Sequence, residues 1–386
     1  MLDIFINRPL VYLDNAATTK PDPRVIDYVK DFMITYYFNP SSSYEYGEYV
    51  RNEIEKSRQI IADFVGCKRN EIIFTSGGSE SDNMCLKGIL KQGDHVITSS
   101  IEHKAILNTC KHLEKQGVEV TYLHTYSSGK IDIDELKNAI QPNTKLISIM
   151  AINNEIGTKQ DLLEIGKVAK EYGIKFHTDA VQAFGKSVID IDKYNIDYMS
   201  VSSHKINGLK GTGFLYAKNQ EISQLIDGGE QEFHLRGGTE NVIGILALGK
   251  AVEIINSEFN ERVNYVNYLC AKFIELLKED NFVSYSKSLS KGFFTNNSES
   301  HIINICFPNL RGEVITRLLD TNGICASTGS ACNTHSGEPS HVLKAIGLTD
   351  DEADSSVRFS LSHTNTLEEI EYTVKTLKNI VSQLGQ

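Results

Sequence analysis

Several features that would place a protein outside the ordinary globular enzymes are missing from this sequence. The 386-residue chain has seven cysteines, an odd number with no C-x-x-C pair, which argues against a disulfide framework or a zinc site. No uncharged apolar run is long enough to cross a membrane, and the first six residues are too short and too acidic to predict a signal peptide. We therefore expect a cytoplasmic protein of a reducing compartment, without a membrane partner or a bound metal.

Excess positive charge is also missing. The net charge is -11 at pH 7, whereas surfaces that bind nucleic acid are normally basic, so we expect no direct nucleic-acid contact. Internal repeats and low-complexity tracts are absent as well. What remains is an ordinary composition, with 40% hydrophobic and 23% charged residues, in a chain long enough to bury a full core in two or three domains.

Strand-like and helical segments alternate through the first half of the chain. This alternation predicts βαβ units and a mostly parallel sheet covered by helices on both faces. The expected strands are 71–75, 95–99, 118–123, 146–150, 174–177 and 198–201, and the expected helices are 48–65, 79–92, 104–116, 132–139 and 161–172. Before them, Pro21 and Pro23 open a helix that we expect to reach about Tyr37.

The alternation ends near residue 242, where a long helix to about residue 280 begins. The remainder mixes a strand at 302–307 with helices at 312–320 and 367–384, and the Ser-, Lys- and Asn-rich segment 284–300 is expected to be an exposed loop. We predict a large domain of residues 15–255 and a smaller α+β domain made of residues 1–14 and 256–386.

A glycine-rich turn joins the first strand to a helix. In the segment 75–81, small residues stand where a backbone must come close to a ligand, and N–H groups at a helix start bind phosphate. Ser79 is suited to cap the helix and to offer its hydroxyl to the anion. The turn is equally compatible with an ordinary strand-to-helix connection, and it lacks the G-x-x-x-x-G-K-[ST] spacing of a P-loop.

Further polar residues follow the next strands. Asp179 can pair with a protonated ring nitrogen of a cofactor, and Gln182 would reach the same plane from a first helical turn, although Asp179 could instead cap a helix. His103 could stack on an aromatic cofactor, and Asn154 follows the strand 146–150. Ligands of open α/β sheets gather at such strand ends.

Lys205 follows the strand 198–201 and is closed in by His204 and a run of glycines. This pattern alone also fits a surface lysine in a turn, but a lysine here is suited to covalent chemistry with a carbonyl cofactor. Phosphate donors, a histidine, an amide, an acid and a lysine thus follow successive strands. Their agreement in position predicts a site for pyridoxal phosphate.

Together these motifs resemble the cysteine desulfurases, which are pyridoxal-phosphate enzymes of the class V aminotransferase group. The resemblance runs from about residue 11 to residue 370. It is carried by the segments 13–19 (LDNAATT), 75–81 (TSGGSES), 102–104 (EHK), 153–157 (NNEIG), 177–182 (HTDAVQ) and 203–205 (SHK). It implies a fold type I transferase with a mostly parallel seven-stranded sheet, and conversion of L-cysteine to L-alanine with transfer of sulfur to an enzyme cysteine.

The resemblance also implies roles for single residues. Lys205 would bind the cofactor covalently, His103 would stack on it and exchange protons, and Cys332 would receive the sulfur. Arg358 and Asn154 would hold the substrate carboxylate. The cofactor-binding residues implied by the resemblance are Gly78, Ser79, His103, Asn154, Asp179, Gln182, Ser202, His204, Lys205 and Thr239.

Partners follow from the same resemblance. Thr239 would reach the cofactor phosphate of a neighbouring subunit, which implies a homodimer. The acceptor of the sulfur would be another protein, from iron–sulfur cluster assembly, tRNA thiolation or DNA phosphorothioation, and no residue selects among these. A selenocysteine lyase, a decarboxylase-type class V enzyme and a sulfur-delivery subunit that is active only with its partner remain open as alternatives.

Overall fold

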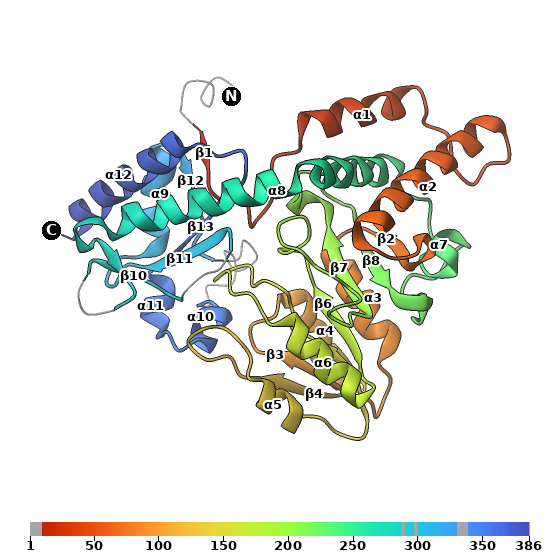
Figure 1. Cartoon of the computed structure of the whole chain (residues 1–386), viewed down its shortest axis with the longest axis horizontal. Helices are drawn as coiled ribbons and strands as arrows, with labels where there is room; N and C mark the ends of the chain where they lie inside the picture. Colours follow the sequence, from red (N-terminus) through yellow and green to blue (C-terminus); the bar gives the residue numbers. More distant parts are fainter. Residues whose placement is uncertain (1–9, 287–289, 297–299, 330–338, 386) are drawn as a thin grey trace.

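The structure, a computed structural model, describes residues 10–286, 290–296, 300–329 and 339–385. Its largest sheet has seven strands in the order β2-β8-β7-β6-β5-β3-β4 (Figure 1). Strand β8 runs antiparallel to both its neighbours, and the other pairs are parallel. The strands are β2 (Ile72–Thr75), β3 (His95–Ser99), β4 (Glu119–Leu123), β5 (Thr144–Ser148), β6 (Lys175–Asp179), β7 (Tyr198–Ser202) and β8 (Gly213–Ala217). The predicted sheet is confirmed.

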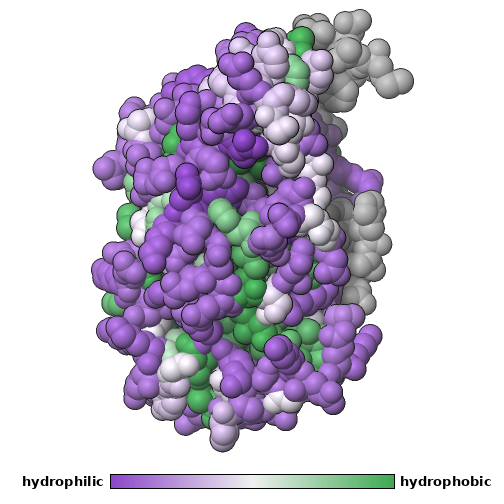
Figure 2. Space-filling view, turned by 90° about the vertical axis from the view of Figure 1, so that its right-hand side faces the viewer, coloured by the Kyte–Doolittle hydropathy of each residue, from purple (hydrophilic) through white to green (hydrophobic). Residues whose placement is uncertain are grey.

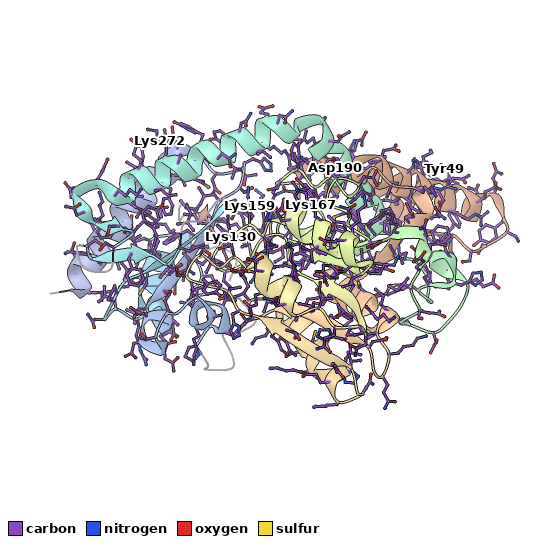
Figure 3. The ribbon with its side chains drawn as sticks, turned by 60° about the horizontal axis from the view of Figure 1, so that its bottom comes forward. Tyr49, Lys130, Lys159, Lys167, Asp190 and Lys272 are labelled. Carbon is purple, nitrogen blue, oxygen red and sulfur yellow. The ribbon has the colours of Figure 1, made fainter. Side chains whose placement is uncertain are left out.

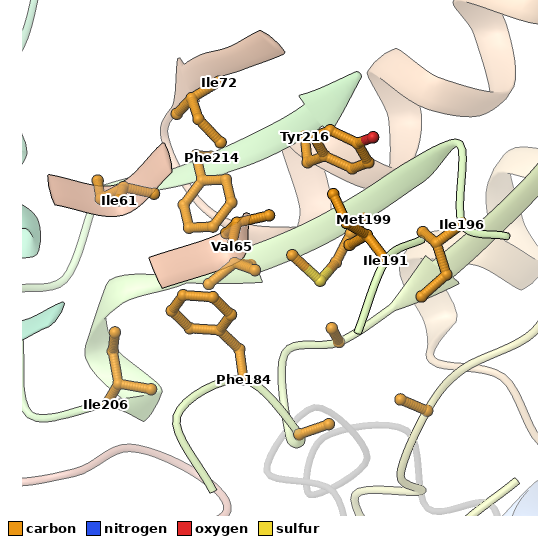
Figure 4. Packing of buried hydrophobic residues seen from close by; sticks show 14 of the residues in the cluster. Ile61, Val65, Ile72, Phe184, Ile191, Ile196, Met199, Ile206, Phe214 and Tyr216 are labelled. Atoms are coloured by element: carbon orange, nitrogen blue, oxygen red, sulfur yellow. The ribbon is translucent and has the colours of Figure 1, made fainter. Parts of the chain in front are cut away.

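Helices cover both faces of this sheet. Alternate residues of a strand point to opposite faces, so Phe214 and Tyr216 of β8 join one core cluster, whereas Leu215 joins the other. The first cluster packs under α1 (Pro23–Ile34), α2 (Glu45–Val65), α6 (Leu162–Tyr172) and the first half of α8 (Val242–Lys278); the second packs under α3 (Gly78–Ile89) and α4 (Lys104–Glu114). Figure 4 shows the first cluster, in which the rings of Phe184 and Phe214 meet edge to face at 5.3 Å.

Helix α8 leaves the large sheet, with the clusters on its two faces, and enters a separate core, which we call the second core. It has 37 residues, which corresponds to about 55 Å at 1.5 Å per residue. Figure 3 shows its length: Tyr49 on α2 lies beyond one end, and Lys272 lies near the other. The second half of α8 packs with α9 (Gly312–Thr321) and α12 (Leu367–Leu384) around Phe273 and Phe359.

The second core covers a four-stranded sheet in the order β13-β11-β10-β9. Its strands are β9 (Val283–Ser284), β10 (Gly292–Phe294), β11 (Ile302–Cys306) and β13 (Ser356–Ser360), and beside it β1 (Val11–Tyr12) pairs with β12 (Ile324–Cys325). The short helices are α5 (Ile133–Asn138), α7 (Gln231–His234), α10 (His341–Ala345) and α11 (Asp350–Asp354). The domain limits given above stay a prediction, which the separation of the two cores supports.

Three local predictions need correction. Helix α1 ends at Ile34 instead of near Tyr37, because the aromatic residues after it stack on one another, Phe38 on Tyr46 at 4.7 Å. The segment 284–300 is not an exposed loop throughout, since β10 lies within it and Phe293 and Phe294 are buried. Strand β8 was not predicted, because its sequence follows a glycine-rich run.

No helix in the described part of the chain is both long enough and apolar enough to cross a membrane.

Candidate active site

The carboxyl ends of the strands in the large sheet surround a cavity of about 250 Å³. Loops that follow β2, β3, β5, β6 and β7 line it, together with Ala16 and Ala17 near the start of the chain and Arg358 of β13. The predicted site residues that line it are Gly78, Ser79, His103, Asn154, Asp179, Gln182, Ser202, His204, Lys205 and Arg358. The cavity therefore gathers residues from seven segments of the chain.

Two predicted residues are not part of this lining. Thr239 is exposed and does not line the cavity of its own subunit. Cys332 lies outside the described residues, which resume at residue 339 after residue 329. The described start of its segment is nevertheless placed next to the site, because Ser327 and Arg358 exchange backbone hydrogen bonds of 2.6 and 3.2 Å.

The turn between β2 and α3 is built for a close approach by a ligand. Gly77 has a φ of 146°, a value that residues with a side chain rarely adopt. A Cβ on Gly78 would lie 2.6 Å from Cγ2 of Val181, so a side chain here would require Val181 to move. Helix α3 begins at Gly78 with Gly77 as its N-cap, so the expectation that Ser79 caps the helix is wrong. The N–H groups of the first turn, which have no partner within an α-helix, border the cavity.

Lys205 ends a short 3-10 turn that follows β7. Its Nζ donates to the carbonyl oxygens of Ala16 and Ala17, each at 2.6 Å. Beside it, Nδ1 of His204 and the Thr18 hydroxyl form a hydrogen bond of 3.1 Å. The chain start thus lies against the lysine turn and holds its amine at the cavity.

Asp179 is the last residue of β6, and its Oδ1 accepts a hydrogen bond of 2.9 Å from the N–H of Val181. Burial raises its pKa, against the effects of that hydrogen bond and of Lys205. The chain continues from Asp179 in turns instead of the helix expected to carry Gln182, which donates to the Ala16 carbonyl at 2.8 Å. Asp179 therefore is no helix cap.

Asp82 lines the same cavity and was not found from the sequence. It is buried on α3, and its Oδ1 lies 3.7 Å from Nε2 of His177 without a hydrogen bond. Burial, followed by the charge of Asp179, raises the pKa of Asp82 well above its usual range. Asp179 has no ion pair within the described ranges. A protonated ring nitrogen of a bound cofactor would supply a positive charge beside it.

His103 and Glu102 connect the ends of β3 and β5. His103 caps α4 by accepting from the N–H of Ala105 at Nδ1, and burial together with Lys205 lowers its pKa to about 4. Its ring is therefore neutral near pH 7. Glu102, also missed from the sequence, accepts from the Ser99 hydroxyl at 2.6 Å and from the N–H of Met150 at 3.0 Å. Burial raises its pKa to about 8.

Arg358 lines the cavity from β13, a strand of the four-stranded sheet. Its Nη2 forms an ion pair of 2.6 Å with Asp14, and its Nη1 donates to the carbonyl oxygen of Asn154 at 2.9 Å. Its Nε is buried without a hydrogen-bond partner. A buried arginine with one unsatisfied donor suits a small carboxylate ligand.

Comparison with known proteins agrees with this geometry. The model of the family Aminotransferase class-V matches residues 11–373. The cysteine desulfurase IscS of Methanosarcina thermophila is 46% identical over 97% of this chain and 92% of its own length. The chain belongs to the class V aminotransferases, among the cysteine desulfurases.

Solved structures show the same fold. A NifS-like protein superposes with a TM-score of 0.89 at 35% identity, covering 97% of this chain and all of its own. A structure described as SspA in complex with cysteine has a TM-score of 0.79 and 40% identity, covering 92% of this chain and all of its own. The resemblance seen in the sequence is confirmed.

Pyridoxal phosphate is the cofactor of this family, and the residues that line the cavity fit it. The β2–α3 turn offers N–H groups to the phosphate, the buried carboxyls suit a protonated ring nitrogen, and Lys205 suits the aldehyde carbon. These pairings rest on the chemistry of the donor set and on the glycine positions that a side chain would fill.

Proposed function

We propose that this desulfurase takes sulfur from L-cysteine, transfers it to Cys332 and releases L-alanine. In this proposal Lys205 transfers the proton, Asp179 pairs with the ring nitrogen of the cofactor, and Arg358 binds the substrate carboxylate. The observation that carries this proposal is the single cavity that brings these three residues together from β7, β6 and β13. Arg358 would hold the carboxylate of an amino acid, and Asp179 and Lys205 would face its reacting end.

When bound, pyridoxal phosphate supplies an electron sink that weakens the bonds at Cα of an amino acid. Asp179 would offer a buried carboxylate to the ring nitrogen, and His103 would stack on the ring as a neutral imidazole. Lys205 would take the proton from Cα and return it, because its amine is held at the cavity in which the substrate would bind.

Arg358 positions the substrate. Its guanidinium is already oriented by Asp14 and by the Asn154 carbonyl, so little freedom is lost when a carboxylate binds. A guanidinium also pairs with both oxygens of a carboxylate, which fixes the direction of the amino acid in the cavity. The solved complex of SspA with cysteine supports a site for this substrate.

Cys332 would receive the sulfur. The sulfur–carbon bond of L-cysteine breaks, a sulfur–sulfur bond forms at Cys332, and the carbon skeleton takes up a proton and leaves as L-alanine. The net change is one thiol and L-cysteine converted to one persulfide and L-alanine, so no oxidant is needed. Only the thiolate is nucleophilic, so the thiol of Cys332 must lose its proton before it attacks.

The test is a comparison of Cys332→Ser with Cys325→Ser. Cys325 ends β12, and burial raises its pKa, which makes it a poor nucleophile and a matched control. We expect Cys332→Ser to keep the visible absorption of the bound cofactor and to lose release of sulfide in the presence of a reducing thiol. Cys325→Ser should keep both. Sulfide release by Cys332→Ser would refute its role, and turnover of selenocysteine alone would favour a selenocysteine lyase.

We further propose a homodimer in which Thr239 contacts the partner's cofactor. The exposure of Thr239 and its absence from its own cavity support this arrangement. An apolar tip between α1 and α2, formed by Met33, Ile34, Tyr37, Tyr44 and Tyr46, is exposed at the same end of the molecule as α7. Figure 2 shows this side, where hydrophobic residues form a strip with hydrophilic residues on either side.

The acceptor of the sulfur is proposed to be a second protein. The curated relatives carry the name IscS, which favours an iron–sulfur scaffold over a tRNA-thiolation or DNA-phosphorothioation enzyme. If the desulfurase activity of the purified protein is low and rises when one acceptor protein is added, the protein is a sulfur-delivery subunit activated by that acceptor. A reducing, cytoplasmic location fits the free thiols of Cys67, Cys85, Cys110, Cys270 and Cys325.

A further inference from the structure

Glu80 stands in the first turn of α3, directly beside the residues that would bind the cofactor phosphate. Its Oε2 accepts a hydrogen bond of 2.8 Å from the N–H of Ser76, and its Oε1 accepts one of 3.0 Å from Nε of Arg236. The Glu80 side chain is 10% exposed and that of Arg236 is 24% exposed. A largely buried ion pair thus borders the β2–α3 turn.

A carboxylate at this place works against the binding of a phosphate. It occupies one N–H group of the turn, and its charge repels a phosphate dianion bound at the same turn. Burial acts to raise the pKa of Glu80, but the hydrogen bonds from Arg236 and Ser76 outweigh burial and hold the pKa below its usual range. Glu80 is therefore charged near pH 7, and its charge must be balanced.

The segment that carries Arg236 is also held by contacts other than the pair with Glu80. Glu232, four residues earlier, forms a buried two-bond ion pair with Arg58, with both distances 2.7 Å, and also accepts from the N–H of Phe74 at 2.7 Å. The guanidinium of Arg58 lies 4.4 Å from the Phe74 ring centroid. The N–H of Gly237 adds a backbone bond of 3.0 Å to Ile226.

We propose that Arg236 is a positioning residue whose charge neutralises Glu80, so that the β2–α3 turn can accept a phosphate dianion. The proposal rests on the proposed function, because it takes the turn to be the cofactor's phosphate site. Arg236 does not reach the cavity itself, and it acts through Glu80. Arg236 instead lines a separate cavity of about 50 Å³, together with Ser76, Gly238 and Glu240 among others.

The experiment is a double-mutant cycle on the apoprotein. The variants are Arg236→Gln, Glu80→Gln and the two combined, and the probes are pyridoxal phosphate, inorganic phosphate and pyridoxal, which has no phosphate. We expect Arg236→Gln to bind both phosphate-bearing probes about tenfold to a hundredfold more weakly, because Glu80 is left uncompensated. Pyridoxal should bind as it does to the unchanged protein.

The combined variant decides the mechanism. A glutamine at position 80 still accepts from the N–H of Ser76 but carries no charge, so the combined variant should regain phosphate affinity to near the starting value. If it binds as weakly as Arg236→Gln, the arginine acts through structure and the proposal is wrong. Unchanged affinity in Arg236→Gln would also refute it.

Two controls separate this result from other failures. Arg317→Gln removes an arginine from an exposed ion pair with Glu313 and should change neither affinity nor the unfolding midpoint. The unfolding midpoint of each apoprotein, measured without ligand, shows whether a variant is folded. Failure of the unchanged protein to bind pyridoxal phosphate would refute the proposed function itself, a result distinct from failure of the cycle.

Discussion

Nη2 of Arg358 lies 2.6 Å from Oδ1 of Asp14, which joins strand β13 to the chain start across 344 residues of sequence. The arginine is 1% exposed and the aspartate 20% exposed, so the pair is largely removed from water. Asp14 was part of the motif seen in the sequence, but no role could be given to it there. The structure makes it the group that holds the candidate substrate arginine.

We expect Asp14→Asn to destabilise the protein. Loss of one partner leaves the guanidinium of Arg358 buried with its charge uncompensated, and we expect the free energy of unfolding to fall by about 1–3 kcal/mol. The KM for L-cysteine should rise, because the arginine is held less firmly. Urea denaturation and steady-state kinetics measure both. Asp27→Asn, which removes an exposed ion pair with Lys30, is the control, and equal stability of the two variants would contradict the prediction.

Gly77→Ala should weaken cofactor binding. Its φ of 146° is strained for alanine, at a cost of about 1–3 kcal/mol, and relief of that strain would move the N–H groups that face the cavity. Gly66→Ala is a matched control, since Gly66 also has a positive φ, 82°, but caps α2 far from the site with open space around it. Titration of each apoprotein with pyridoxal phosphate, followed by absorbance, compares them. Equal affinity would show that the turn tolerates a side chain.

Glu102 should make the apoprotein less stable as the pH rises through 8. Its pKa is about 8 in the folded protein against an ordinary 4.5, because it is buried. Between these values the folded state holds a proton that the unfolded state has released, so the free energy of unfolding falls as the pH rises. Glu102→Gln removes this contribution and should make the decline less steep, while the buried Asp82 keeps its own contribution of the same sign.

The range from pH 6.5 to 8.5 is the one to measure. Burial lowers the pKa of His103 to about 4 and that of His177 to about 3, so these histidines reduce stability only below their ordinary value of 6.5, as the pH falls. Urea denaturation at several pH values gives the slope. Glu114→Gln, at an exposed position on α4, should keep the slope of the unchanged protein. An unchanged slope in Glu102→Gln would mean that Glu102 is not the buried acid responsible.

The apolar tip offers a test of the homodimer. Tyr37 is 75% exposed and Tyr46 is 58% exposed, and replacing both by serine removes aromatic surface that a partner subunit would cover. We expect sedimentation velocity to show dissociation at protein concentrations where the unchanged protein is dimeric. Tyr172→Ser, on α6, should not dissociate the dimer. A dimer that survives the double replacement would place the interface elsewhere.

The sequence predicted the parts of the site that depend on local pattern. Alternation of strands and helices places Asp179 and Lys205 at strand ends whatever the details of packing, and the structure puts both at one cavity. The roles of Asp82 and Glu102 could not be predicted in the same way. Their pKa shifts arise from burial beneath β3, β5 and β6, which is known only when the sheet is assembled. Strand β10 was missed for a related reason, because Phe293 and Phe294 are buried by distant residues.

Helix α8 carries the chain from one core to the other without a break at any residue from 242 to 278. Because the helix has no hinge, a rotation of one end of α8 also rotates the other end. The other connection runs from β1 through Ala16 and Ala17, whose carbonyl oxygens hold Lys205. A change in the angle between the two cores would therefore move the carbonyl oxygens that accept from the amine of Lys205, the residue that we propose to carry the substrate's proton.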